Sequence, residues 1–262
     1  MTNLAVSPSP WAIHPSYQLP AAGGLQIGTF VKTPAPHVIE VLATCGLDFT
    51  VLDAEHAPMD RAALDLALLA GRAVQLPQFV RVLDSSAGAI LTALDLGAIG
   101  LLVPHIDTAD DAAVAVAHAR YRGGDRGFSG SARFGGYGTL GMREALRVGD
   151  QALVMCQIES AQAVQACEAI AAVPGVAGVF IGRADLALSM GLDTVQDPRI
   201  EEAVDHIVRV GLAAGKTVGM AVNSTSERNR FAALGATWFV QGSDQSLLRE
   251  AARAIARCVD PI

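Results

Sequence analysis

Polar side chains able to do chemistry follow directly after several short apolar runs of this sequence. Asp53, Glu55 and His56 stand in the segment LDAEHAP, and Arg81 ends the run QFVR. The same place after later runs is taken by Gln157, Glu159, Arg183, Asp185 and Asn223. Carboxylates, a guanidinium and an imidazole brought to one site could hold a metal ion, bind an anionic substrate and move a proton.

Two of these carboxylates, Glu159 in CQIES and Asp185 in IGRADL, follow consecutive apolar runs. If the runs are neighbouring strands, the carboxylates converge and repel each other unless a proton or a cation lies between them. Oxygen ligands favour a hard divalent ion, and two protein ligands leave positions open for water and substrate. We therefore predict a site for Mg²⁺, Mn²⁺ or Co²⁺, which such ligands do not distinguish. The alternative is that one acid caps the helix beginning at IESAQ or RADLA.

The imidazole of His56 comes three residues after Asp53. A carboxylate bonded to one ring nitrogen fixes the tautomer and raises the basicity of the other nitrogen. We therefore predict that His56 and Asp53 form an acid/base pair. A histidine more often has a structural role, which we assign to the remaining ones: His14, His37, His105, His118 and His206.

Arg81 could hold a carboxylate or an enolate oxygen, because a guanidinium keeps its charge and binds in planar geometry. A surface pair with an acid on a helix is the alternative. The backbone N–H groups of Ala184 and Asp185 stand at the start of an expected helix, where a small carboxylate could bind.

Lysine chemistry is confined to two positions, because Lys32 and Lys216 are the only lysines among the 19 basic residues. An imine or pyridoxal mechanism needs one of these amines. Lys32 follows the first apolar run, whereas Lys216 precedes the seventh and is expected at the wrong end of that strand. A metal-based route needs neither lysine.

The elements that must position these residues alternate between short apolar runs and Ala/Leu-rich segments of helical period, which indicates repeated βα units. Eight such units predict a single (β/α)₈ TIM barrel, in which residues just past the strand ends form the active site. No GxGxxG follows the first run, which disfavours a Rossmann sheet. The expected strands are 25–30, 49–53, 78–82, 99–103, 153–158, 178–181, 217–222 and 237–241. The expected helices are 36–45, 61–72, 85–96, 109–120, 161–173, 200–214, 226–234 and 246–259.

Two segments stand outside this repeat. Residues 1–23 are rich in proline and read as an irregular arm on the surface or on a neighbouring subunit, before a barrel domain of residues 24–262. Residues 121–140, between the fourth and fifth strands, are rich in Gly, Arg and Ser. They are either a flexible excursion or a binding loop on the active end, where long βα loops lie.

Composition narrows the class of protein. Apolar residues make up 51% of the 262-residue chain and charged residues 17%, which is ample for one large core. The net charge of −7 and the absence of a basic run argue against nucleic acid, and the lack of a long apolar stretch argues against a membrane. The cysteines are widely spaced, so we expect buried thiols, no disulfides and a cytoplasmic location: Cys45, Cys156, Cys167 and Cys258.

Six segments resemble, in order and spacing, the HpcH/HpaI family of class II pyruvate aldolases, which includes hydroxyketoacid and dehydro-deoxy-glucarate aldolases. The likeness runs from about Gly24 to Ala256. The segments are GLDFTVLDAEHAP, FVRV, GLLVPHI, RYRGGDRGFSGSAR, VMCQIES and GVFIGRADLALSMG.

This resemblance implies a divalent-metal enzyme that forms or cleaves the bond between an aldehyde and the methyl carbon of pyruvate or an analogue such as hydroxypyruvate. It also implies a hexamer, a trimer of dimers with exchanged C-terminal helices. Glu159 and Asp185 match the metal ligands, Arg81 the group on the keto and carboxylate oxygens, His56 with Asp53 the acid/base pair, and Gln157 the polar neighbour of the metal.

Two departures from the family pattern leave substrate preference open. Arg183 stands in IGRADL where IGPADL is usual, and Arg122 in YRGG where YPP is usual. The alternative activities are an acyl-CoA lyase of the malyl- or citramalyl-CoA type and an oxaloacetate decarboxylase. From another class, the chain could be a non-catalytic barrel that serves as a binding module.

Overall fold

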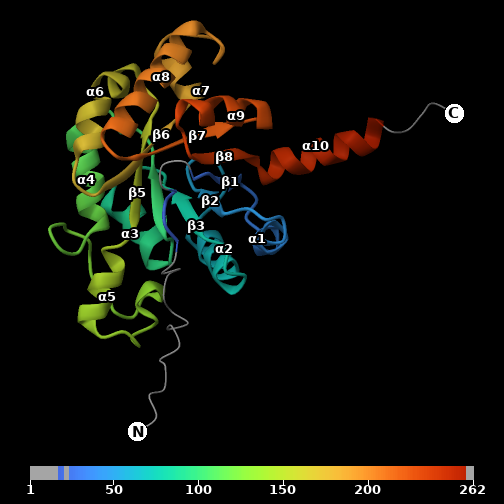
Figure 1. The fold of residues 1–262 in the computed structure, drawn as a ribbon. Coiled ribbons are helices and arrows are strands. Elements are labelled where there is room, and N and C mark those ends of the chain that lie inside the picture. The colour runs from blue at the N-terminus through green and yellow to red at the C-terminus, as the bar shows by residue number, and fades with distance from the viewer. Residues whose placement is uncertain (1–16, 21–23, 258–262) are drawn as a thin grey trace.

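A computed structural model describes residues 17–20 and 24–257 of the chain. Eight parallel strands pair in sequence order and close on themselves, since β1 also pairs with β8, and helices surround them (Figure 1). The predicted (β/α)₈ barrel is therefore confirmed. No helix among the described residues is both long and apolar enough to cross a membrane.

The strands agree with the predicted runs to within two residues at each end, because strands covered on both faces read as continuous apolar segments. They are β1 (Gln26–Val31), β2 (Phe49–Asp53), β3 (Gln78–Arg81), β4 (Gly100–Val103), β5 (Leu153–Ile158), β6 (Val176–Ile181), β7 (Thr217–Val222) and β8 (Trp238–Ser243).

The eight helices predicted with residue ranges are present, and a helix also begins at the RADLA segment, as expected: α7 (Arg183–Ser189). Two further helical segments were not predicted: η1 (Arg133–Gly135) and α5 (Met142–Gly149). Side chains at several N-caps accept backbone N–H groups, as Asp60 does before α2 and Ser160 before α6. The remaining helices are α1 (Pro36–Ala43), α2 (Arg61–Ala73), α3 (Ala87–Asp95), α4 (Ala109–Ala119), α6 (Ala161–Ala172), α8 (Pro198–Ala213), α9 (Thr225–Leu234) and α10 (Asp244–Arg257).

The interior of the barrel is filled with aromatic side chains near the amino-terminal ends of the strands. Phe49 stacks on Trp238 with ring centroids 4.1 Å apart, and Phe79 meets the edge of Trp238 at 5.0 Å. Gly100 makes room for this packing, since a Cβ there would lie 2.4 Å from the Phe79 ring. This end of the barrel is therefore closed by packing.

The described part of the predicted arm, residues 17–20, lies against that closed end. The hydroxyl of Tyr17 accepts a hydrogen bond from Trp238 Nε1 at 3.0 Å and donates one to Gln26 at 2.7 Å. The Tyr17 ring also meets the edge of Phe79. Residues 1–16 and 21–23 lie outside the described residues, so the division into arm and barrel stays a prediction.

The Gly-, Arg- and Ser-rich segment between α4 and β5 lies at the amino-terminal end of the barrel, so one of the two readings given above, a binding loop on the active end, is wrong. The extra residues follow α4 and lead into β5, which makes them an αβ connection (Figure 1). Arg133 binds the backbone oxygens of Asp65 and Leu96, and Arg126 pairs with Asp95. Arg122 belongs to the same segment and lies exposed at this end.

Candidate active site

Three neighbouring strands bring a lysine, an aspartate and an arginine together at the carboxyl end of the barrel. Val31 of β1 pairs with Leu52 of β2, so Lys32 and Asp53 come next on the two strands, and Asp53 pairs with Arg81 of β3. Arg81 Nε and Nη2 donate to the two oxygens of Asp53 at 3.0 and 2.7 Å. Lys32 Nζ lies 3.1 Å from Asp53 Oδ2.

The carboxylate of Asp53 is fully buried and carries a negative charge held by these partners. Burial alone would raise its pKa, but the hydrogen bonds and charge of Arg81, with the backbone N–H of His56 and the ammonium of Lys32, lower the pKa below its usual value. Asp53 Oδ1 also accepts the backbone N–H groups of Glu55 and His56. Asp53 therefore anchors Arg81 and is unsuited to act as a base.

The predicted pairing of Asp53 with the ring of His56 is wrong, because Asp53 binds only the backbone of His56 and is otherwise saturated by Arg81 and Lys32. The carboxylate near the ring is Glu55, whose Oε2 lies 3.6 Å from His56 Nε2. Burial raises the pKa of Glu55, and the charge of Glu159 adds to this, while Arg81 and both nearby imidazoles oppose it. His56 itself is half-exposed and accessible to a ligand.

Glu159 follows β5 and is buried, with the amide of Gln157 donating to its Oε2. Gly182, which follows β6, lies against it: a Cβ on Gly182 would come within 2.9 Å of Glu159 Cβ and 3.0 Å of Oε2. Gln157 Oε1 is buried and has no hydrogen-bond partner within the described part of the chain. The structure thus brings Gln157 and Glu159 together, as the sequence predicted.

His105, assigned above to a structural role, belongs to this site. Its backbone N–H donates to Glu159 Oε1 at 2.7 Å, and its ring nitrogens lie 3.2 Å from that oxygen and 3.0 Å from Glu55 Oε1. Its φ of +57° is a left-handed conformation that a non-glycine residue adopts at a cost. The ring of His105 therefore bridges two buried carboxylates at the end of β4.

Asp185 lies in the first turn of α7 and is exposed. Gly182 precedes that helix and its N–H binds Ile158 O of β5, so Asp185 and Glu159 share the carboxyl rim of the barrel. They are not at opposite ends of the molecule. Ala184, also exposed, opens the same helix, which has seven residues.

The guanidinium of Arg183 is turned toward β7 and α9. Its Nη2 lies 2.6 Å from Glu227 Oε1 and donates to Ala221 O at 3.1 Å, and the group stacks over Phe231. Asn223, another predicted polar residue at a strand end, donates its backbone N–H to Glu227. Arg183 thus links the start of α7 to β7 and α9.

The donors at the carboxyl end fit a hard divalent cation. Glu159 and Asp185 supply carboxylate oxygens, and Gln157 Oε1 is a buried oxygen with no hydrogen-bond partner in the part of the chain that the structure describes. Among the described residues no group of three or more His, Cys, Asp or Glu is arranged to hold a metal ion. Two carboxylates would therefore leave the other coordination positions to water and substrate.

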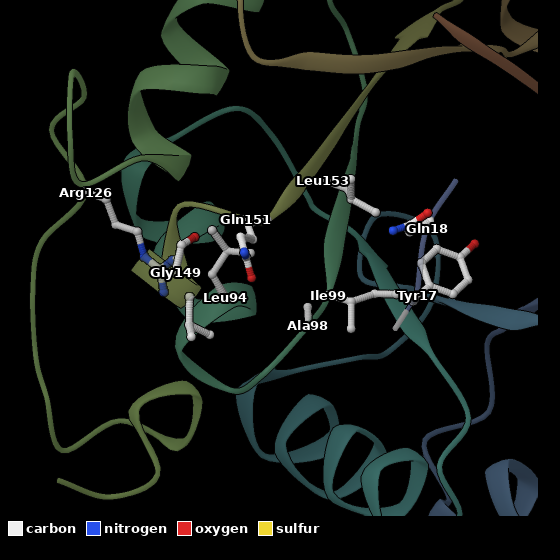
Figure 2. Close-up of a pocket in the computed structure, with 11 residues that line it drawn as sticks. Tyr17, Gln18, Leu94, Ala98, Ile99, Arg126, Gly149, Gln151 and Leu153 are labelled. Atoms are coloured by element: carbon white, nitrogen blue, oxygen red, sulfur yellow. The ribbon is translucent and has the colours of Figure 1, made fainter. Parts of the chain in front are cut away.

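A pocket of about 200 Å³ lies at the other end of the barrel (Figure 2). Its lining includes Ile99, which precedes β4, and Leu153, the first residue of β5, together with Tyr17 and Arg126. The guanidinium of Arg126 lies over the rings of Tyr121 and Phe134 and pairs with Asp95. The charge of Arg126 is thus part of the packing at this end, and the chemistry-bearing residues described above do not line the pocket.

Three residues to which the sequence analysis gave no role in the metal-based site contact the predicted ones, and a fourth, Asp244, contacts one of those three. Lys32 and His105 stand just past β1 and β4, so the rule used for the other strand ends could have found them. Glu55 was noted but given no partner. Asp244, the first residue of α10, is buried and accepts the backbone N–H groups of Lys32 and Thr33, a contact across the whole chain that no local motif predicts.

Comparison with known proteins gives one family and matches over nearly the whole length of each chain. The sequence profile of the HpcH/HpaI aldolase/citrate lyase family matches residues 26–251. A 5-keto-4-deoxy-D-glucarate aldolase from Klebsiella pneumoniae is 38% identical over 90% of this chain and 93% of its own. An HpcH/HpaI aldolase/citrate lyase family protein from Burkholderia cenocepacia has a TM-score of 0.85 and 34% identity, covering 89% of this chain and 94% of its own. A citrate synthase, SbnG, has a TM-score of 0.80 and 27% identity, covering 90% and 93%.

Proposed function

Since the chain belongs to the HpcH/HpaI aldolase/citrate lyase family and is an aldolase, a carbon–carbon lyase, we propose that it cleaves or forms 4-hydroxy-2-oxo acids. Pyruvate or an analogue such as hydroxypyruvate is the 2-oxo acid, and an aldehyde is its partner. One observation carries this proposal: a guanidinium anchored on a buried carboxylate, Arg81 on Asp53, shares the carboxyl end of the barrel with the buried Glu159.

Glu159 and Asp185 are the residues that would hold the divalent cation, with the amide of Gln157 beside them. A bound divalent cation polarises the keto oxygen of a 2-oxo acid and stabilises the negative charge that develops on it. Mg²⁺, Mn²⁺ and Co²⁺ all suit these oxygens. The backbone N–H groups of Ala184 and Asp185 are further candidate donors to the substrate carboxylate.

The guanidinium of Arg81 is positioned by Asp53 to bind an anionic oxygen. Its Nε and Nη2 are fixed on Asp53, and the contacts found within the described residues leave Nη1 for a ligand. Because the guanidinium is only 8% exposed, its charge acts in a medium that screens it weakly. We assign to Arg81 the carboxylate and the developing enolate oxygen of the 2-oxo acid.

His56 is the residue that moves a proton. Glu55 Oε2 lies 3.6 Å from Nε2 of the ring, beyond hydrogen-bond distance, and has no hydrogen-bond partner among the described residues. A small approach of the ring would let Nε2–H bind this carboxylate and leave Nδ1 as the acceptor. In cleavage, Nδ1 takes the proton of the aldol hydroxyl, directly or through a water molecule, as the carbon–carbon bond breaks and the aldehyde C=O forms. In synthesis the same nitrogen returns that proton.

We also propose that the enzyme is a homo-oligomer, with a hexamer as the form implied by the family. The helix α10 projects away from the barrel (Figure 1) and exposes apolar side chains, with Leu248 and Ile255 each 73% exposed. Such a face is buried when a second copy covers it. A cytoplasmic location is proposed on the free thiols of Cys45, Cys156 and Cys167; Cys45 is exposed, contrary to the expectation of buried thiols, and Cys258 lies outside the described residues.

The test is exchange of the pyruvate methyl protons in D₂O, followed by proton NMR with and without a chelator. We expect exchange that needs a divalent cation. Glu159→Gln keeps the shape of the side chain but removes its charge, so exchange should fall on the order of 10³-fold. His56→Ala should reduce exchange by a smaller factor, about 10²-fold.

Glu168→Gln is the matched control, because Glu168 is an exposed residue of α6, the helix that follows Glu159. It should exchange like the unaltered enzyme. Exchange that survives exhaustive chelation, or that is equal in Glu159→Gln and Glu168→Gln, would remove the cation and its ligands from the mechanism.

A further inference from the structure

Lys32 is a charged residue of the site to which the mechanism above gives no task. It directly follows β1 and shares Asp53 with Arg81, at 3.1 and 2.7 Å from the same oxygen. Arg81 has a second carboxylate beside it, since its Nε lies 3.3 Å from Glu55 Oε2, whereas Asp53 is the carboxylate within ion-pair distance of Lys32 among the described residues. An ammonium also has three N–H donors, of which the contacts found in the described residues use one.

The three charged groups differ in exposure. The side chain of Asp53 is 0% exposed and that of Arg81 is 8% exposed, whereas that of Lys32 is 27% exposed. Lys32 is thus the member of the cluster that faces a ligand entering from the carboxyl end. A charge in this position attracts an anion and is weakly screened by the buried groups behind it.

The position of Lys32 is fixed by the other end of the chain. Asp244 is buried and accepts the backbone N–H groups of Lys32 and Thr33 at 2.9 and 3.0 Å. These bonds fix the backbone from which the side chain extends, and the contact of Nζ with Asp53 Oδ2 at 3.1 Å holds the ammonium at the carboxyl end. A binding group that is already held in place loses less freedom when it contacts a ligand.

The two cations and the predicted metal ligands lie on different sides of the site. Lys32 follows β1 and Arg81 ends β3, with Asp53 and Glu55 between them at the end of β2, whereas Glu159 and Asp185 follow β5 and β6, across the barrel. The side of Glu159 and Asp185 would hold the cation and with it the 2-oxo acid. The opposite side, where Lys32 is the more exposed of the two cations, is then left for the second substrate.

We propose that Lys32 binds the anionic group of an aldehyde that carries a carboxylate, and so selects charged aldehydes over neutral ones. This inference rests on the proposed function and adds to it a residue that determines specificity. The contact is an ammonium–carboxylate hydrogen bond, which differs from a role in the carbon–carbon bond itself. Lys32 forms no covalent bond to the substrate in this scheme.

The experiment measures kcat/KM for addition of pyruvate to two aldehydes of similar size, glyoxylate, which is an anion, and glycolaldehyde, which is neutral. Lys32→Met retains the length of the side chain and removes its charge. In Lys32→Met we expect kcat/KM for glyoxylate to fall about 10- to 100-fold more than kcat/KM for glycolaldehyde. This factor corresponds to the usual contribution of a hydrogen bond to a charged group. Lys32→Arg should restore part of the difference.

Lys216→Met is the matched control, because Lys216 is the other lysine of the chain and precedes β7, at the amino-terminal end, where its ammonium binds Val176 O. Its ratio of the two kcat/KM values should equal that of the unaltered enzyme. Equal losses with both aldehydes in Lys32→Met, including complete loss with both, would overturn the proposal, since Lys32 would then serve a step common to both reactions.

Two further measurements distinguish a failure of this inference from a failure of the proposed function. Treatment with pyruvate and borohydride should leave Lys32 unmodified; a 1-carboxyethyl group on Lys32, the product of imine formation and reduction by borohydride, found by mass spectrometry, would make Lys32 an imine-forming nucleophile instead. If the unaltered enzyme shows no cation-dependent exchange of pyruvate protons, the proposed function itself fails. If exchange is present and the aldehyde ratio does not change in Lys32→Met, only the role of Lys32 fails.

Discussion

The two ends of the barrel both contain buried charged groups, but they use them differently. At the amino-terminal end, the guanidinium of Arg126 lies over the rings of Tyr121 and Phe134 and pairs with Asp95. At the carboxyl end, Asp53 contacts two cations, Arg81 and the partly exposed Lys32, and Gln157 Oε1 is buried with no hydrogen-bond partner among the described residues. A charge packed against aromatic rings and paired with one acid belongs to the packing, whereas two cations that share an acid, one of them exposed, are ready for a ligand.

The largest expected effect is a loss of activity when Asp53, at the carboxyl end of the barrel, loses its charge. Asp53→Asn preserves the shape of the side chain but removes the charge that anchors Arg81 and Lys32, so both cations lose their fixed positions. We expect the exchange of pyruvate protons to fall on the order of 10²- to 10³-fold. The rate is to be measured per folded molecule, with circular dichroism on the same samples. Activity within about threefold of the unaltered enzyme would contradict the assignment of Asp53 as an anchor.

A smaller effect, on stability alone, is expected at the amino-terminal end. Tyr17→Phe removes the acceptor of the buried Trp238 Nε1 and the donor to Gln26. The free energy of unfolding should fall by about 1–2 kcal/mol, measured by urea denaturation, because a buried donor loses its partner. The kinetic constants should not change. A loss of activity as large as that of Asp53→Asn would mean that the two ends are not functionally separate.

The smallest expected effect is a change in the pH dependence of stability. The pKa of Asp53 is lower in the folded protein, so its contribution to stability is present above the unfolded pKa, about 3.9, and is lost as the pH falls through the folded value. Unfolding free energies measured below pH 4 should therefore decline less steeply in Asp53→Asn. The difference in slope cannot exceed about 1.4 kcal/mol per pH unit for one group. Parallel slopes would show that the pKa of Asp53 is unshifted.

The parts of this comparison that depend on local pattern could be predicted from the sequence. Continuous apolar runs marked the strands, and the rule that strand ends carry the chemistry brought Arg81, Gln157 and Glu159 to one rim. The partner of His56 could not be predicted in this way. It depends on which of two nearby carboxylates, Asp53 or Glu55, is saturated by groups from other strands.

The errors share a cause, which is that contacts between distant segments have no local pattern. The reading of the Gly-rich segment after residue 120 as a binding loop on the active end assigned its length to the βα side of α4, whereas the extra residues follow that helix. His105 was assigned a structural role because a histidine more often has one, and no local pattern marks the left-handed turn that brings its ring to Glu55 and Glu159.

Asp244 joins the projecting helix to the catalytic chamber. It is the first residue of α10, and its carboxylate accepts the backbone N–H groups of Lys32 and Thr33. A fusion partner or affinity tag attached beyond that helix could shift α10, and Asp244 would pass this shift to the backbone of Lys32. An affinity tag for kinetic work is therefore better placed at the amino terminus. A truncation made before Asp244 would remove α10 and also the hydrogen bonds that position the backbone of Lys32.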